Sequence, residues 1–169
     1  AETVTEVSKG TDTPCSLIGA ADGLVAAIDD EIGDVRKRAA GTLGRLRGMS
    51  PEVTDGAVEA LISALNDKRH LVRMSAAEAL GQIGSEAPEQ AERAVDPLIA
   101  ALNDDSKFVR REAATALGRI GSIEPDQVDD GIERLVTAID DERWGVRCEA
   151  AKAIGRIGST APEQVDGAV

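Results

Sequence analysis

Apolar residues recur along this chain with the spacing of amphipathic helices, and the helices come in pairs. In the first helix of each pair, apolar positions follow i, i+3, i+4 and i+7, which places them on one face. The series reads Val58, Leu61, Ile62 and Leu65 in one copy. It returns 37 residues later from Val95 and again from Ile132. We call this segment helix A and expect its first copy near residues 20–28.

A second helix, helix B, follows each helix A after an acidic turn. Its apolar stripe falls at offsets 0, 4, 8 and 11 from Val35, again one helical face. The predicted copies of helix B are 34–46, 71–83, 108–120 and 145–157. Each copy carries a Val-Arg pair at its start, always 37 residues after the previous pair. A fixed period of this size predicts a stack of similar helix pairs.

Prolines and glycines predict where these helices begin, end and touch. Prolines stand at the expected first turn of helix A, at Pro51, Pro88, Pro125 and Pro162. Pro97 lies inside one helix A and should kink it or mark where its main segment begins. Glycines expected to end helix B as left-handed caps are Gly84, Gly121 and Gly158. Glycines inside helix B predict close backbone contact between helices, at Gly44, Gly81, Gly118 and Gly155.

An aspartate precedes the arginine of each Val-Arg pair by six residues. The four pairs are Asp30 and Arg36, Asp67 and Arg73, Asp104 and Arg110, and Asp141 and Arg147. The aspartate is expected to cap helix B and to accept hydrogen bonds from the turn. Across stacked units, the aspartates and arginines should form a ladder of charge-assisted hydrogen bonds.

The repeat divides the chain into two unequal parts. Residues 1–19 match the pattern poorly, and we interpret them as an atypical N-terminal cap or a degenerate earlier repeat. Residues 20–169 form an array of about four units, in which the last residues restart the pattern. We therefore expect a piece of a longer array. We see no targeting segment and no apolar run of the ~18 residues that a membrane span needs, so we expect a cytoplasmic protein.

Composition narrows the classes of partner. The net charge is −12, the only Phe and Trp are Phe108 and Trp144, and there is no Tyr. Such a surface does not attract nucleic acid or anionic membranes over long range. Acidity with few lysines and few aromatics resembles proteins of salt-loving archaea. Cys15 and Cys148 lie at unrelated repeat positions and suggest neither a disulfide framework nor a zinc site.

The repeated residues resemble those of HEAT repeats, and in particular the HEAT-like class first described in phycobilin lyases. The matching elements are an aspartate, Val-Arg, paired alanines and a closing (Leu/Ile)-Gly-x-Ile-Gly, as in residues 104–121. The resemblance implies an all-α superhelix of the HEAT/armadillo type, right-handed, with helix A on the convex side and helix B on the concave side. It does not fix the function, because the same scaffold serves unrelated partners.

Candidate catalytic chemistry is sparse in this chain. His70 is the only histidine, so the sequence contains no two-histidine metal site. A serine or cysteine nucleophile would have only His70 as a histidine base, and nothing in the spacing supports such a pair. The acidic clusters recur at one turn of each unit, which favours capping and solvation over cation binding. We therefore expect no enzyme, no metal and no cofactor.

Basic residues concentrate in helix B. The four stretches 36–47, 73–84, 110–121 and 147–158 hold twelve of the 19 basic residues and only three acids. If helix B lines the inner face, a basic groove lies in an acidic body and favours an acidic segment or helix as ligand. The alternative is that the Val-Arg arginines are already neutralised in the ladder, which leaves a smaller excess.

Residues near the start of helix B vary between units while the framework stays constant. We predict that these variable residues bind a partner: Lys37, His70, Leu71, Met74, Lys107, Phe108, Arg111, Trp144 and Cys148. Trp, Met and Arg are typical of binding hot spots. The competing interpretation is that Leu71, Phe108 and Trp144 fill space between adjacent turns. The leading hypothesis is a non-catalytic scaffold that binds another protein through the concave helix B face. The alternative is a lyase or lyase-subunit role of the phycobilin lyase type, as the resemblance allows; nucleic-acid binding is less favoured.

Overall fold

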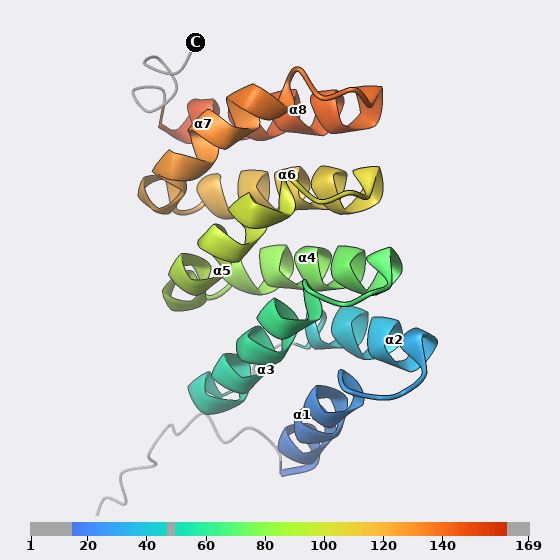
Figure 1. The fold of residues 1–169 in the computed structure, drawn as a ribbon. Helices are drawn as coiled ribbons and strands as arrows, with labels where there is room; N and C mark the ends of the chain where they lie inside the picture. Colours follow the sequence, from blue (N-terminus) through green and yellow to red (C-terminus); the bar gives the residue numbers. More distant parts are fainter. Residues whose placement is uncertain (1–14, 47–49, 162–169) are drawn as a thin grey trace, which may run out of the picture.

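The structure, a computed structural model, describes residues 15–46 and 50–161, and within them every regular element is a helix. Helices alternate between two layers along the chain (Figure 1). Layer A contains α1 (Cys15–Ala27), α3 (Pro51–Ala64), α5 (Pro88–Ala101) and α7 (Asp129–Ala138). Layer B contains α2 (Gly33–Leu43), α4 (His70–Gly84), α6 (Lys107–Gly121) and α8 (Trp144–Thr160). The chain is an all-α solenoid of stacked helix pairs, as the periodicity predicts.

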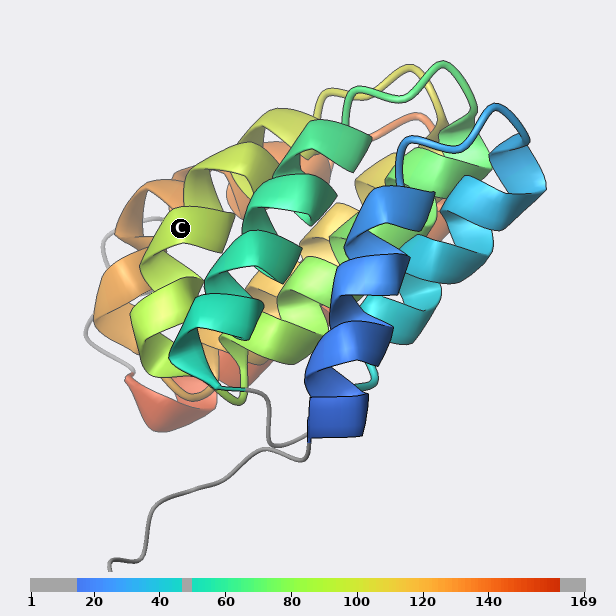
Figure 2. The ribbon, with the colours of Figure 1, turned by 90° about the horizontal axis from the view of Figure 1, so that it is seen from below.

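The B helices form the more tightly associated layer. In Figure 1 they lie side by side from α2 to α8, and Figure 2, which looks along the stack, shows the A and B layers as separate rows. Successive B helices contact each other more extensively than successive A helices do. Each A helix also packs against the B helix that follows it. Contacts between units are therefore made mainly by layer B.

The hydrophobic core lies between the two layers, where the apolar stripes meet. In α4 the stripe is Val72, Ala76, Leu80 and Ile83, which are all buried. From layer A, Val58 and Leu61 are fully buried against it. The stripe is less complete in the outer units, where Val35 and Ile154 are half-buried. Helices at either end of the described stack have a neighbouring unit on one side only, which explains this difference.

Three of the four glycines predicted to mark close contacts allow the B helices to approach each other closely, whereas a Cβ atom at Gly155 would meet nothing within 4 Å. A Cβ atom added at Gly81 would lie 2.5 Å from Cβ and 2.7 Å from Cα of Ala116. Gly44 meets Ala79 and Gly118 meets Ala153 in the same way. An atom at either glycine would overlap the backbone of the next helix, so a side chain there would push the units apart. The repeated Gly–Ala contact therefore sets the spacing of layer B.

Helix ends agree with the sequence only in part. Pro51 and Pro88 begin α3 and α5 as predicted. Pro125 instead begins a short 3-10 helix, η1 (Pro125–Val128), and α7 follows it. The prediction that Pro97 marks the start of a main segment is wrong, because α5 runs from Pro88 through it. Pro162 lies outside the described residues.

The prediction of left-handed glycine caps is also wrong. Gly84 and Gly121 are the last residues of α4 and α6, but neither has a positive φ, and the C-cap residues Ser85 and Ser122 have φ of −76°. Gly158 likewise lies within α8. A Cβ atom at Gly84 would lie 2.8 Å from Cδ1 of Ile120, so this glycine lies in close contact with a side chain of α6.

The first unit departs from its predicted limits. α1 begins at Cys15, five residues before the predicted start of helix A at 20, so residues 15–19 belong to a helix of the array. Residues 1–14, most of the predicted cap, lie outside the described residues. α2 ends at Leu43, earlier than predicted, and Gly44 continues in a right-handed conformation as its C-cap.

Replacing Gly81 by Ala should destabilise the protein by about 1–3 kcal/mol, because the new methyl group overlaps the backbone of α6. Gly56→Ala is the matched control. Gly56 also lies inside a helix, but a Cβ there meets nothing within 4 Å, so this change should stabilise by about 0.5–1 kcal/mol. Denaturant unfolding of both variants measures the two effects. Effects of the same sign would contradict the assignment of Gly81 to a close contact.

Candidate partner-binding face

Adjacent units are joined by arginine–aspartate pairs at one edge of layer B. Arg110 donates from Nε and Nη2 to the two carboxylate oxygens of Asp141 in the next unit, at 2.7 and 3.0 Å. Both side chains are nearly buried, 11% and 12% exposed. The same bidentate contact joins Arg36 to Asp67 and Arg73 to Asp104. Such charge-assisted pairs fix both distance and orientation.

Each ladder arginine also holds the turn of its own unit. Nη1 of Arg110 donates to the carbonyl oxygen of Asp104 at 2.9 Å, and Nη1 of Arg73 donates to that of Asp67 at the same distance. One guanidinium therefore connects the turn before its helix to the turn of the next unit.

The aspartates organise the turns but do not cap the helices. Oδ1 of Asp141 accepts a hydrogen bond from the backbone N–H of Arg143, two residues on, at 2.7 Å. Asp30, Asp67 and Asp104 repeat this bond at the same length. The N-cap position of each B helix is the residue two after the aspartate, and none makes a side-chain cap bond. The capping prediction is therefore wrong, and the bond is an Asx turn.

The hydrogen bonds from Arg110 lower the pKa of Asp141 below its ordinary value, despite the opposing effect of partial burial. Arg36 lowers the pKa of Asp67 for the same reason. Both carboxylates are therefore negatively charged at neutral pH.

Most of the predicted partner-binding residues fall into two groups on the surface of layer B that faces away from layer A. We call this surface the outer surface of layer B. Phe108 is the centre of the first group. Its ring stacks on that of His70 from the preceding unit, with centroids 6.0 Å apart and planes inclined by 21°. Lys107 Nζ lies 5.0 Å and Arg111 Cζ 6.0 Å from the centroid of the same ring. Phe108 is nonetheless 40% exposed.

A cavity of about 220 Å³ separates Phe108 from Trp144. It is lined by Lys107, Phe108, Arg111, Arg143, Trp144, Gly145 and Val146. Gly145 occupies the position that Phe108 has in the previous unit, and a Cβ there would meet only the Arg111 side chain, at 3.8 Å. The missing side chain opens the space. We call this cavity the aromatic pocket; its lining contains three cations and no carboxylate.

Lys37 and Met74 belong to a second cavity, a groove of about 630 Å³ between α2 and α4. It is lined by Asp34, Lys37, Arg38, Gly41, Thr42, Arg45, Met74, Ser75 and Glu78. Gly41 stands where later units have Glu78, Thr115 and Lys152, so a missing side chain opens this space too. We call it the basic groove, because three cations line it.

Three predicted residues line neither cavity. His70 contacts the Phe108 ring but is not part of either lining. Leu71 is half-buried and lines neither of them. Cys148 is a half-buried free thiol beside Lys152, whose ammonium pairs with Glu149 at 2.7 Å.

Three cations of the cavity linings were not among the predicted partner-binding residues, although the basic stretch 36–47 includes two of them. Arg143 lies in the turn before α8, Arg38 lies on α2, and Arg45 directly follows Gly44, the C-cap of α2. Each stands at a repeat position that varies between units: Arg143 corresponds to Ser106, and Arg45 to Gln82. Extending the search for variable positions into the turn and along the helix would have found them.

Acidic side chains also lie on the B helices, near the cations. Burial raises the pKa of Glu112, and the neighbouring charges of Glu78 and Glu149 raise it further. Glu78 accepts a hydrogen bond from Gln82, and Glu149 pairs with Lys152. The face is therefore not uniformly basic.

Across residues 15–46 and 50–161, no three His, Cys, Asp or Glu side chains are grouped so that they can hold a metal ion. In the same part of the chain, no helix has the length and apolar character to cross a membrane.

Stacked helix pairs joined by a repeated side-chain ladder define an α-solenoid repeat protein. The family model for HEAT repeats matches residues 21–92 and 95–167. The chain therefore belongs to the HEAT-repeat family. No curated protein matches it.

Solved structures show the same architecture. The chain is similar to an engineered protein at 26% identity and a TM-score of 0.72, over 88% of this chain and 66% of the other. It is similar to a designed armadillo repeat protein in complex with the peptide (KR)4, at 28% identity and 0.69, over 89% and 70%. The E. coli protein YIBA shares the fold at 24% identity and 0.70, over 92% and 52%.

Asp141→Asn should destabilise the protein by about 1–3 kcal/mol at pH 7, because Arg110 loses its charged acceptor while the Asx turn keeps one. Folding lowers the pKa of Asp141, so its contribution is present above the unfolded pKa of about 3.9 and is lost as the pH falls through the folded value. The difference from the unaltered protein should therefore shrink below about pH 4. Denaturant unfolding at pH 7 and pH 3 measures it, with exposed Asp96→Asn as control. A deficit that is independent of pH would refute the charge-based role.

Glu112→Gln should stabilise the protein at pH 7 by on the order of 0.5 kcal/mol, because the folded protein no longer holds a half-buried carboxylate beside two others. Folding raises this pKa, so the penalty exists above the folded value and disappears below the unfolded one. The gain should vanish near pH 4 in thermal unfolding. Exposed Glu133→Gln should change little at either pH; a loss of stability in Glu112→Gln at pH 7 would show that the carboxylate is favourable.

Proposed function

We propose that this chain is a non-catalytic scaffold that binds a segment of another protein on the outer surface of layer B. One observation carries the proposal. The chain's only Phe and Trp both lie exposed on this surface, 40% and 76%, on either side of one cavity. Folding gains little from aromatic rings left in water, whereas binding gains much from covering them.

The surrounding cations support the same function. Lys107 and Arg111 flank the Phe108 ring, and Arg143 lines the aromatic pocket next to Trp144. Arginine beside aromatic rings is a common composition of binding hot spots. The cavity therefore suits a side chain with an apolar part and a negative charge close to it.

Rigidity of the framework favours binding. The ladder and the Gly–Ala contacts hold successive B helices at fixed spacing, so their side chains are already positioned before a ligand arrives. Less conformational entropy is then lost on binding.

The similar designed armadillo protein is in complex with a peptide of Lys and Arg. Its likeness to this chain supports peptide binding by the layer, but the charge differs here. The aromatic pocket and the basic groove carry cations, which favours an acidic segment. The overall charge of −12 argues against nucleic acid and membranes as partners.

The test is selection of ligands from a displayed peptide library. Peptides enriched by the unaltered protein should bind at least about tenfold more weakly to a variant with Phe108→Ala, Arg111→Gln and Trp144→Ala, because these side chains supply the contact area and charge. Titration of each enriched peptide measures the loss.

The control variant carries Arg134→Gln and Ile139→Ala, which remove an exposed cation and an exposed apolar side chain beside layer A. It should bind as the unaltered protein does. Wild-type affinity in the triple variant, or no enriched peptide, would count against the proposed function.

A further inference from the structure

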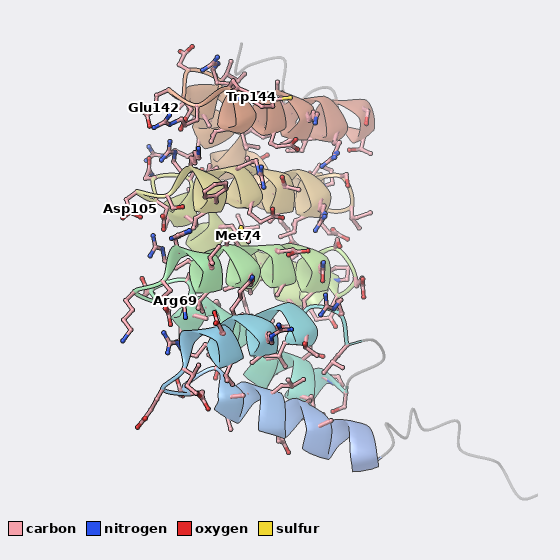
Figure 3. All side chains as sticks on the ribbon, turned by 90° about the vertical axis from the view of Figure 1, so that its right-hand side faces the viewer. Arg69, Met74, Asp105, Glu142 and Trp144 are labelled. Carbon is pink, nitrogen blue, oxygen red and sulfur yellow. The ribbon has the colours of Figure 1, made fainter. Side chains whose placement is uncertain are left out.

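The aromatic pocket and the basic groove lie on one face, and their cations stand in register. Lys37, Met74 and Arg111 occupy equivalent positions on α2, α4 and α6, 37 residues apart. Figure 3 looks onto layer B and shows Met74 and Trp144 on this surface. A ligand that crosses the stack therefore meets a cation, a thioether and a second cation in turn.

Within the described residues, one of the six cations that line the two cavities forms an ion pair: Arg143 Nε lies 3.2 Å from Glu142. Lys37, Arg38 and Arg45 form no ion pair there, although all three line the basic groove. At the other end, Lys107 and Arg111 contact the Phe108 ring instead of a carboxylate. Each end is therefore suited to a negatively charged side chain.

Spacing between the two groups follows from helix packing. Neighbouring helices lie about 8–10 Å apart, so two steps of the stack cover roughly 16–20 Å. An extended peptide advances about 3.3 Å per residue. Two acidic side chains that reach Lys37 and Arg111 should thus be about five or six residues apart.

Carboxylates on this face select against a uniform polyanion. Glu78 lines the basic groove together with Met74, and its charge contributes to the raised pKa of Glu112 on α6. The evenly spaced phosphates of a nucleic acid would place negative charge against these carboxylates. A peptide avoids this repulsion by placing an uncharged side chain there, against Met74.

We propose that the outer surface of layer B binds an extended peptide with two acidic residues five or six positions apart, an apolar residue midway and an aromatic residue next to the second acid. The first acid pairs with the basic groove, the second pairs with Arg111, and the aromatic ring enters the pocket between Phe108 and Trp144. This inference rests on the proposed function and specifies its ligand.

Trp144 provides the measurement, because it is the chain's only tryptophan and lines the aromatic pocket. Its fluorescence is followed during titration with the peptide Glu-Ser-Gly-Leu-Gly-Ser-Glu-Phe and with Ser-Gly-Leu-Gly-Ser-Glu-Glu-Phe, which has the same composition but adjacent acids. The spaced peptide should bind at least about fivefold more tightly. The preference should weaken with added salt.

A groove variant with Lys37→Gln, Arg38→Gln and Arg45→Gln locates the first acid. It leaves the aromatic pocket intact and should bind both peptides alike, whereas Arg134→Gln should keep the preference. Circular dichroism verifies that each variant is folded.

Equal binding of the two peptides by the unaltered protein, or a preference that survives in the groove variant, would overturn the inference. So would a single-stranded oligonucleotide that displaces the spaced peptide at lower concentration than the peptide itself binds. If library ligands depend on Phe108 and Trp144 but show no acidic spacing, protein binding stands and the two-acid ligand fails. If neither assay detects binding, both proposals fail.

Discussion

The bidentate contact between an arginine and the aspartate of the next unit is the interaction on which this structure depends. It joins two nearly buried charges with well-aligned hydrogen bonds, so it tolerates little change in distance or angle. The Gly–Ala contacts impose the same restriction along the helices through close packing. Together they bring the B helices into a fixed register. The apolar core between the layers stabilises the stack, but apolar burial has no preferred direction and would not by itself specify this register.

Because the framework residues fix the geometry, the remaining positions on layer B can vary without changing how the units stack. Removing a side chain at Gly145 or Gly41 opens a cavity without disturbing a neighbouring helix. Aromatic and basic residues then gather around these openings. Stability and recognition are carried by different residues in the same helices, so changes in one set should combine nearly additively with changes in the other.

The sequence predicts what each unit repeats. Helix pairs, the buried stripe and the close approach at Gly81 follow from periodicity, because the same residues meet the same surroundings in every unit. The conformation at the helix ends is predicted less well, because it also depends on contacts between units. Gly84, for example, lies in close contact with the Ile120 side chain of the next unit. The sequence predicts the basic character of the B helices but not where the cavities lie. They arise where a glycine faces larger side chains of a neighbouring helix, and one sequence read along its length does not show which residues face each other.

Arg147 shows that the two contacts made by a ladder arginine are separable. Its Nη1 already donates to the carbonyl oxygens of Asp141 and Glu142, at 2.9 and 3.2 Å, although no aspartate of the described chain contacts its remaining nitrogens. The contact of the arginine with its own turn can therefore form without the contact between units. Folding can then begin in any helix pair and spread to its neighbours through short-range contacts, a mechanism that suits rapid folding and makes the unit, rather than the whole chain, the elementary cooperative step.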